Sequence, residues 1–211
     1  MEIFSYSPRE LDYLKSKDKK LGLAIERIGT IKRRVIPDLF AALVNTVISQ
    51  QISTKAAATV WRRIQERFEP LSPQSLCEAA LEEIQQCGLS WRKAEYLKGI
   101  GEAVAQGRLA MTEFSALDDA DITRRLSAMP GIGIWSAEML LIFSLQRPDV
   151  VSWGDLGIRR GMMRLYGLEK LDKTTFDKYK KRYSPYGSVA SLYLWAIAAE
   201  QPPPLKLSGA E

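Results

Sequence analysis

The sequence predicts an all-α fold, and three observations support that prediction. Apolar residues recur at three- and four-residue intervals through most of the chain, as they do on one face of a helix. No segment shows the alternating β-branched pattern bounded by turn residues that marks a sheet. Residues typical of helix caps and helix ends stand between the periodic segments. We therefore expect helices that follow one another without a long low-complexity linker.

The first clearly periodic segment predicts a helix over residues 39–48. It breaks at Gln50-Gln51-Ile52, after which Ser53 or Thr54 can cap a helix that continues to Phe68. The next helix starts at Leu71-Ser72-Pro73 and is expected to run unbroken to Cys87-Gly88, where glycine is a typical C-terminal stop.

The remaining segments extend the same pattern to the C-terminal region. A helix over 91–105 and a shorter one over 119–128 precede a Pro-Gly-Ile-Gly turn, and a strongly apolar helix then covers about 135–145. The last expected helices are 156–166, 174–183 and 188–200. From Gln201 onward three consecutive prolines predict an extended tail.

Composition limits the protein's class. Apolar residues make up 46% and charged residues 26%, no apolar run approaches the roughly 18–20 residues of a membrane span, and Met1–Ser5 lacks signal-peptide features. We therefore expect an intracellular protein, in the cytoplasm and nucleoid or in the nucleus. The net charge of +5 favours a polyanionic partner. Lysine and arginine occur in short clusters, which are also typical of solvated helix faces: 17–20, 33–34, 62–63, 92–93, 124–125, 159–160 and 180–182.

The chain contains no histidine and only two cysteines, Cys77 and Cys87. Two cysteines cannot hold a four-cysteine iron–sulfur or zinc site, so we expect two core thiols, with a disulfide as the less favoured alternative. The absence of histidine excludes Ser-His and Cys-His nucleophilic catalysis and histidine metal centres. Any chemistry must use carboxylates, lysine, tyrosine or backbone groups.

The most informative segment is Met129-Pro130-Gly131-Ile132-Gly133-Ile134-Trp135. Two glycines two residues apart, between two helices, allow a tight turn that directs backbone N–H groups outward at the start of the second helix. Gly131, Ile132, Gly133 and Ile134 would then bind phosphate through the backbone, without reading sequence. The alternative is a plain helical hairpin whose glycines only permit close packing.

This hairpin resembles the Leu-Pro-Gly-Val-Gly hairpin of the helix-hairpin-helix (HhH-GPD) DNA glycosylase superfamily. Two more segments resemble its alkylated-base branch, the 3-methyladenine DNA glycosylase II type: Asp155-Leu-Gly-Ile-Arg-Arg-Gly161, and residues 47–57 around Gln50-Gln51-Ile52. The resemblance covers about residues 37–200. It implies two helical lobes, approximately 35–150 and 1–30 with 155–211, with a DNA-binding cleft between them.

The resemblance also implies an activity. It is hydrolysis of the N-glycosidic bond of alkylated purines of the 3-methyladenine or 7-methylguanine type in duplex DNA, after base flipping, leaving an abasic site. Asp155 matches the family's essential aspartate, which stabilises positive charge on the deoxyribose. Asp155 could instead cap the helix that begins at Leu156, and the two roles are compatible. Ser152 and Gly154 depart from the family, which often has proline and a second acidic residue there.

Trp135 stands where bifunctional members have a nucleophilic lysine, so strand cleavage through a Schiff base is not expected. Trp135 and Trp195 are the leading candidates for a base pocket, and Trp153 and Tyr193 are weaker ones. Each of these aromatic residues could instead belong to the core.

The resemblance further places a wedge that fills the gap of the flipped base at Gln50, Gln51 or Ile52, without choosing among them. Arg159 and Arg160 either face phosphate or are simply solvated. A structural Na⁺, K⁺ or Mg²⁺ ion would bind the backbone carbonyls of Ser127, Met129 and Ile132. No cofactor or iron–sulfur cluster is expected for catalysis.

The expected partner is therefore duplex DNA that contains damaged bases, bound by a monomer and away from membranes. Two alternatives remain open at this point. One is a helix-hairpin-helix DNA-binding module without enzymatic activity. The other is a glycosylase for deaminated or oxidised bases.

Overall fold

The structure is a computed structural model that describes residues 2–200, and the expected tail from Gln201 lies outside this range. Within it the chain forms twelve α-helices and one 3₁₀ helix. Among these residues, extended backbone is paired only at one antiparallel bridge, between Ile3 and Arg34. The prediction of an all-α fold is thus confirmed. None of the helices in this range has the length and apolar character that a membrane span needs.

The described chain divides into two compact units. Unit 1 comprises residues 2–4 and 34–147, and unit 2 comprises residues 5–33 and 148–200. The expected division placed residues 2–4 with the terminal helices, whereas in the structure they belong to unit 1. They lie in unit 1 because the Val35 N–H donates to the Glu2 carbonyl oxygen at 3.1 Å beside the Ile3–Arg34 bridge.

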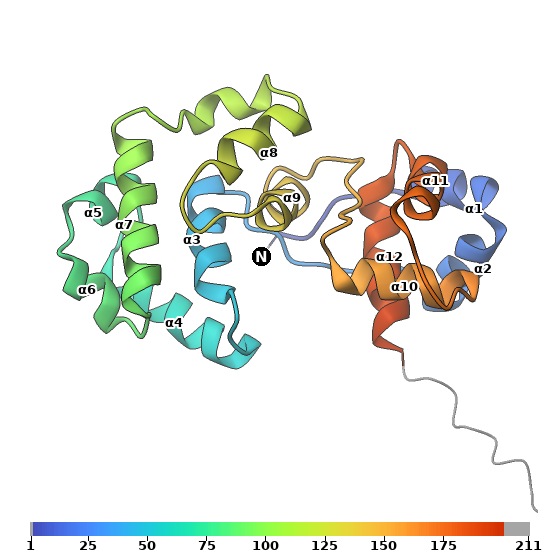
Figure 1. Cartoon of the computed structure of the whole chain (residues 1–211), viewed down its shortest axis with the longest axis horizontal. Coiled ribbons are helices and arrows are strands. Elements are labelled where there is room, and N and C mark those ends of the chain that lie inside the picture. The colour runs from blue at the N-terminus through green and yellow to red at the C-terminus, as the bar shows by residue number, and fades with distance from the viewer. Residues whose placement is uncertain (1, 201–211) are drawn as a thin grey trace, which may run out of the picture. The chain divides into compact units, whose positions relative to one another are not determined.

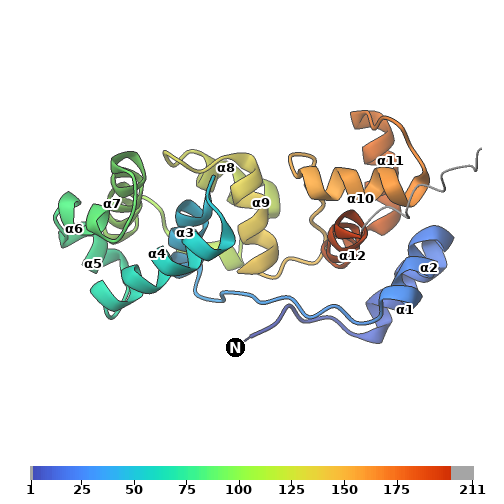
Figure 2. The same ribbon diagram turned by 90° about the horizontal axis from the view of Figure 1, so that it is seen from below.

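Unit 1 contains seven α-helices and the 3₁₀ helix among its described residues. In Figures 1 and 2, α5 and α6 lie beside α7, and α3 packs against α4, α7 and α9. Helix α9 is almost wholly apolar and is buried from Ser136 to Ile142 except at Glu138, so it forms part of the core. The elements are α3 (Leu39–Ser49), α4 (Thr54–Arg67), α5 (Pro73–Glu78), α6 (Leu81–Gln86), α7 (Trp91–Ala105), η1 (Met111–Ser115), α8 (Asp119–Ser127) and α9 (Ile134–Phe143).

The single helix expected from residue 73 to residue 87 is wrong, because α5 and α6 are separated at Ala79-Ala80. Both alanines are extended, with ψ of 144° and 146°. From α7 the Lys98 ammonium donates to the carbonyls of Cys77 and Ala79, at 3.0 and 2.7 Å. The Lys98 ammonium thus bonds carbonyl oxygens that would accept backbone N–H groups if the helix continued. The break therefore depends on a tertiary contact that local periodicity does not contain.

Unit 2 is built around α12 (Gly187–Ala199), whose side chains are buried from Val189 to Leu194. Helix α10 packs closely against α12, and the two N-terminal helices complete the unit (Figure 1). The bounds of these two N-terminal helices, which are capped by Ser7 and Asp18, were not predicted from the sequence. The other elements are α1 (Pro8–Lys17), α2 (Lys19–Ile28), α10 (Leu156–Tyr166) and α11 (Lys173–Tyr183).

A buried hydroxyl–carboxylate network ties the far end of α10 to its neighbours. The Tyr166 hydroxyl donates to Asp18 Oδ2 at 2.7 Å and lies 2.8 Å from the Tyr183 hydroxyl. Burial raises the pKa of both tyrosines, so both hydroxyls stay protonated. The network fixes α10 at its C-terminal end, opposite the residue that begins it.

The two cysteines are both free, so the disulfide alternative is wrong. Cys87 is buried, as expected for a core thiol, and burial raises the pKa of its thiol. Cys77 is only half-buried, so it belongs to the edge of the core.

Candidate functional site

Asp155 begins α10 as its N-cap residue, as the capping alternative predicted. Its Oδ1 accepts the Ile158 N–H at 2.8 Å and the indole N–H of Trp195 at 2.9 Å. The residue is 7% exposed, so the carboxylate is held in one orientation by two donors from different helices. A fixed and largely desolvated carboxylate can act on developing positive charge without first reorganising.

Two glycines on α10 allow Trp195 to reach this carboxylate. A Cβ at Gly161 would lie 2.0 Å from the carbonyl oxygen of Leu194, and a Cβ at Gly157 would lie 2.7 Å from Cδ1 of Trp195. Both distances are below any real contact, so α12 can approach α10 only where side chains are missing. The four-residue spacing of these glycines is visible in the sequence and could have indicated a close helix crossing beside Asp155.

The structure brings Trp195 to Asp155 but gives Tyr193 a different place. Tyr193 has no exposed surface, and its hydroxyl donates to the Gly29 carbonyl at 2.9 Å. Burial raises the pKa of this phenol, which remains a protonated donor. The assignment of Tyr193 to a base pocket is therefore wrong, because the side chain is a core residue that anchors the end of α2.

Trp153 is half-buried in unit 2, where another aromatic ring and an arginine contact it. Its ring meets Phe176 edge-on at 5.1 Å, and the guanidinium of Arg159 lies 5.0 Å from its centroid. The neighbouring Arg160 is exposed. Of the two arginines that follow the aspartate, one is thus packed on an indole and the other faces solvent. Ser152, at the position of the family's proline, is fully buried.

The hairpin in unit 1 has the tight geometry that its glycines predicted. Gly131 has a φ of +84°, and a Cβ there would lie 2.3 Å from the Tyr96 ring. Ile132 is buried and anchors the turn, while Ile134 and Trp135 are 63% and 43% exposed. Gly133 caps α9 without a side-chain hydrogen bond. A helix start of this kind presents backbone N–H groups and the positive end of the helix dipole to an anion.

The loop between α3 and α4 carries the three wedge candidates, and their side chains differ in placement. The Gln50 amide donates to the Gly131 carbonyl at 2.8 Å, which connects this loop to the hairpin. Gln51 is exposed and has a φ of +56°, and Ile52 is 41% exposed. The amide of Gln50 is thus engaged within the protein, whereas Gln51 and Ile52 present their side chains at the surface.

Sequence reasoning missed Lys93, which lies under the same loop. From α7 its ammonium donates to the carbonyls of Ile48 and Gln50, at 2.8 and 2.6 Å. Burial lowers the pKa of Lys93. The only sequence signal was its place in the Arg92-Lys93 pair, which has the appearance of a solvated face.

The backbone carbonyls of Ser127, Met129 and Ile132 belong to the hairpin region. The Met129 oxygen accepts the Ile132 N–H at 3.1 Å, and a carbonyl oxygen retains a second lone pair for a cation. Neutral carbonyl oxygens suit hard cations such as Na⁺, K⁺ or Mg²⁺, and the structural ion at these three residues stays a prediction. No cluster of three or more His, Cys, Asp or Glu residues with metal-binding geometry occurs among residues 2–200.

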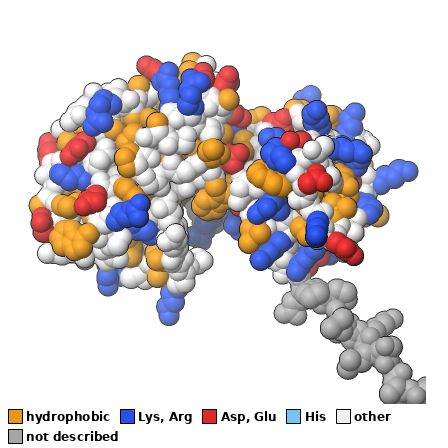
Figure 3. Space-filling view, in the orientation of Figure 1, with side chains coloured by type: hydrophobic (Ala, Val, Ile, Leu, Met, Phe, Trp, Pro, Cys, Tyr) orange, Lys and Arg blue, Asp and Glu red, His pale blue; other side chains and the backbone are white. Residues whose placement is uncertain are grey.

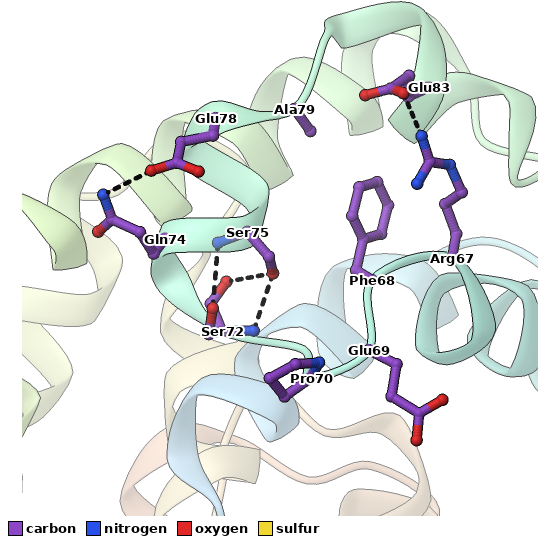
Figure 4. A pocket seen from close by; sticks show the side chains of 10 residues that line it. All are labelled: Arg67, Phe68, Glu69, Pro70, Ser72, Gln74, Ser75, Glu78, Ala79 and Glu83. Carbon is purple, nitrogen blue, oxygen red and sulfur yellow. Dashed lines mark hydrogen bonds and ion pairs between the residues drawn. The ribbon is translucent and has the colours of Figure 1, made fainter.

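A hollow on the surface of unit 1 lies apart from these residues. This hollow of about 480 Å³ is lined by the C-terminal end of α4, the segment that follows it, α5 and Glu83 of α6, and Figure 4 shows the ion pair of Arg67 with Glu83 among the lining residues. None of the predicted site residues lines it.

In Figure 3 lysine and arginine are spread over the visible face of each unit among acidic and apolar side chains, rather than gathered in one patch.

The chain matches the family model of HhH-GPD superfamily base excision DNA repair proteins over residues 44–185. It is 35% identical to DNA-3-methyladenine glycosylase 1 of Schizosaccharomyces pombe over 161 residues, which cover 74% of this chain and 71% of that one. Among solved structures, a DNA-3-methyladenine glycosidase from Bacillus halodurans superposes with a TM-score of 0.84 at 37% identity, covering 94% of this chain and 93% of that one. A Schizosaccharomyces pombe 3-methyladenine DNA glycosylase in complex with abasic DNA superposes with a TM-score of 0.76 at 30% identity, covering 89% and 95% of the two chains. The chain therefore belongs to the HhH-GPD superfamily of base excision DNA repair proteins.

Proposed function

We propose that this protein is a monofunctional DNA glycosylase that removes alkylated purines, of the 3-methyladenine and 7-methylguanine type, from duplex DNA. The observation that carries the proposal is the carboxylate of Asp155, held by Ile158 and Trp195 at the start of α10. The names of the relatives support the substrate class, since both the glycosylase and the glycosidase are named for 3-methyladenine. The protein acts as a monomer on DNA inside the cell.

In the proposed reaction the damaged nucleotide is flipped out of the helix and its C1′–N bond breaks. The base leaves with the bonding electron pair, and positive charge develops on the deoxyribose. The Asp155 carboxylate stabilises that charge, and its two N–H donors prevent it from rotating away. A water molecule then forms the C1′–O bond and loses a proton to solvent. An abasic site remains, which is the kind of DNA bound in the related Schizosaccharomyces pombe structure.

The substrate class fits this chemistry because an alkylated purine carries positive charge and departs as a neutral base. Aromatic faces attract such a cation, with an interaction of about 0.5–2 kcal/mol. Trp135, at the hairpin, and Trp195, beside Asp155, are the proposed aromatic contacts. Trp135 has no amine, so no Schiff base with the sugar forms and the strand is not cleaved.

The hairpin is proposed to hold the DNA backbone through the N–H groups at the start of α9. Ile134 and Gly133 are exposed, so the backbone there is accessible to a phosphate. A structural cation on the carbonyls of Ser127, Met129 and Ile132 would add positive charge beside the phosphate. Gln51 and Ile52 are the proposed wedge, because the Gln50 side chain is bonded to Gly131.

The decisive experiment compares wild-type protein with Asp155→Asn on duplexes that each contain one methylated, deaminated or oxidised base. Asparagine can still accept the two N–H bonds at Oδ1, so the variant should fold. Loss of the negative charge should lower single-turnover release of methylpurine by about 100-fold or more. Full activity in the variant contradicts the mechanism, and preferential release of an oxidised or deaminated base contradicts the substrate class. No release of any base indicates a DNA-binding module without enzymatic activity.

A further inference from the structure

We infer that Lys93 is a positioning residue that sets the conformation of the loop 50–53 and thereby the side chain that enters the DNA. The inference rests on the proposed function, in which this loop fills the gap left by the flipped nucleotide. Lys93 would not touch DNA or the reacting atoms. It would act through the backbone of the loop.

The first observation is the pair of bonds that Lys93 makes. Its ammonium is 2.8 Å from the carbonyl oxygen of Ile48 and 2.6 Å from that of Gln50. The first belongs to the last turn of α3, whose carbonyls have no partner further along the helix. The second belongs to the peptide bond that joins Gln50 to Gln51. One cation therefore caps α3 and fixes the peptide plane immediately before Gln51.

The second observation is the strained backbone at Gln51. A φ of +56° is in the left-handed region, which is sterically unfavourable for a residue with a Cβ. Such a conformation persists only where the surroundings impose it. The Lys93 bond to the preceding peptide is a contact that imposes it, because releasing the Gln50 carbonyl would let the peptide rotate back. Lys93 thus maintains the turn that exposes the Gln51 side chain.

The third observation is that the same face of α7 also supports the hairpin. Tyr96, three residues after Lys93, lies against Gly131 so closely that a Cβ on this glycine would be 2.3 Å from the ring. The Gln50 amide closes the connection with its bond to the Gly131 carbonyl at 2.8 Å. The wedge loop and the phosphate-binding hairpin are consequently fixed to one another within unit 1. We infer that DNA held by the hairpin meets Gln51 in a set position.

Lys98 offers a matched control on the same helix. Its ammonium also donates to two carbonyls, those of Cys77 and Ala79, at 3.0 and 2.7 Å, and it is likewise half-buried. Its bonds stabilise the break between α5 and α6, far along the chain from the loop. Lys93→Met and Lys98→Met therefore remove the same kind of interaction, and only the first should affect the loop.

The experiment uses the full chain and a duplex with a stable abasic analogue opposite 2-aminopurine. Insertion of Gln51 beside this orphaned base should change the 2-aminopurine fluorescence, and the signal requires no excision. Lys93→Met should lose most of this change, and its single-turnover release of methylpurine should fall by about 10- to 100-fold. Its affinity for undamaged duplex should stay within about twofold, because the hairpin contacts to phosphate remain. Lys98→Met should resemble wild type in all three measurements.

Equal fluorescence changes in Lys93→Met and Lys98→Met, at saturating protein, would overturn the inference. If Lys93→Met does not fold, Lys93→Arg provides the test, because a planar guanidinium cannot replace a compact ammonium between two carbonyls without shifting them. Its fluorescence change should then be smaller than that of Lys98→Arg, and an equal change again overturns the inference. A third outcome is a fluorescence change that wild type shows and Lys93→Met loses, without release of any base by wild type. That outcome contradicts the proposed function and leaves the inference about Lys93 intact.

Discussion

Trp195 shows how one side chain can have a role beyond the one its residue type suggests. The resemblance places its ring in a base pocket, and the structure adds that its indole N–H is bonded to Asp155 Oδ1 at 2.9 Å. Hydrogen bonds to charged groups contribute about 1.5–3 kcal/mol, more than neutral ones. Trp195 is therefore also a positioning residue for the proposed catalytic carboxylate.

Trp195→Phe tests this role because it keeps an aromatic ring and removes only the N–H donor. We expect single-turnover release of methylpurine to fall by about 10- to 100-fold, the equivalent of one charged hydrogen bond. Binding to undamaged duplex should not change, since the bond is internal to the protein. Trp153→Phe is the control, because the indole contacts of Trp153 involve its ring face and edge with Arg159 and Phe176. Equal rates in the two variants would show that the N–H donor is unimportant.

At the scale of elements, the crossing of α10 and α12 decides where Asp155 is held. The helices approach so closely at Gly161 that the carbonyl oxygen of Leu194 occupies the position of a Cβ. This crossing is set by backbone atoms, which cannot rotate away as a flexible side chain could. Glycine is thus required at this position for the indole of Trp195 to reach Asp155.

Gly161→Ala should lower the free energy of unfolding by about 1–3 kcal/mol or more, since α12 must move to admit the methyl group. Activity should also fall at temperatures where the variant is folded, because the movement withdraws Trp195 from Asp155. Gly99→Ala is the opposite case. Gly99 lies inside α7, and apart from its chain neighbours and the nearby backbone of its own helix no atom lies within 4 Å of its Cβ position, so alanine should stabilise the helix by about 0.5–1 kcal/mol. Denaturant unfolding of both variants checks the pair, and a Gly161→Ala protein as stable as wild type contradicts the close crossing.

At the scale of the whole molecule, composition limits the chemistry more than any single motif does. The sequence has no histidine and two cysteines, and those cysteines are not joined. The proposed hydrolysis needs only a carboxylate, two N–H donors and water. Nothing in that reaction depends on a redox centre or on a metal-bound nucleophile.

We therefore expect purified protein to contain less than one equivalent of iron. We also expect its single-turnover excision rate, measured at saturating enzyme, to be unchanged after treatment with EDTA. A structural divalent ion at the hairpin would affect DNA affinity and not the rate of the bound complex. Metal analysis and single-turnover assays with and without EDTA check this. An excision rate that disappears with EDTA and returns with a metal ion would contradict the metal-free mechanism.

Most helices could be predicted from the sequence because their signals are local. The segments 91–105 and 156–166 were predicted with the bounds that the structure has, since apolar spacing, a capping residue and a following glycine or loop lie within a few residues of each other. The break at Ala79-Ala80 could not be predicted, because the group that stabilises it is Lys98 on another helix. The hairpin's shape was predictable for the same local reason, as its glycines encode the turn directly.

The all-α class, the tight hairpin and the position of Asp155 as the N-cap residue of a helix could be predicted from the amino-acid sequence. All three depend on neighbours in the chain. Helix packing brings together groups that are distant in the chain: Trp195 on Asp155, Tyr193 on the Gly29 carbonyl in the core, and Lys93 under the loop of Gln51. Residue type does not decide this, because a tryptophan or a tyrosine can lie in the core or at a surface, and a lysine can be solvated or can bond buried carbonyls. Helix packing selects among these roles, and it is fixed by contacts across the whole unit rather than by adjacent residues.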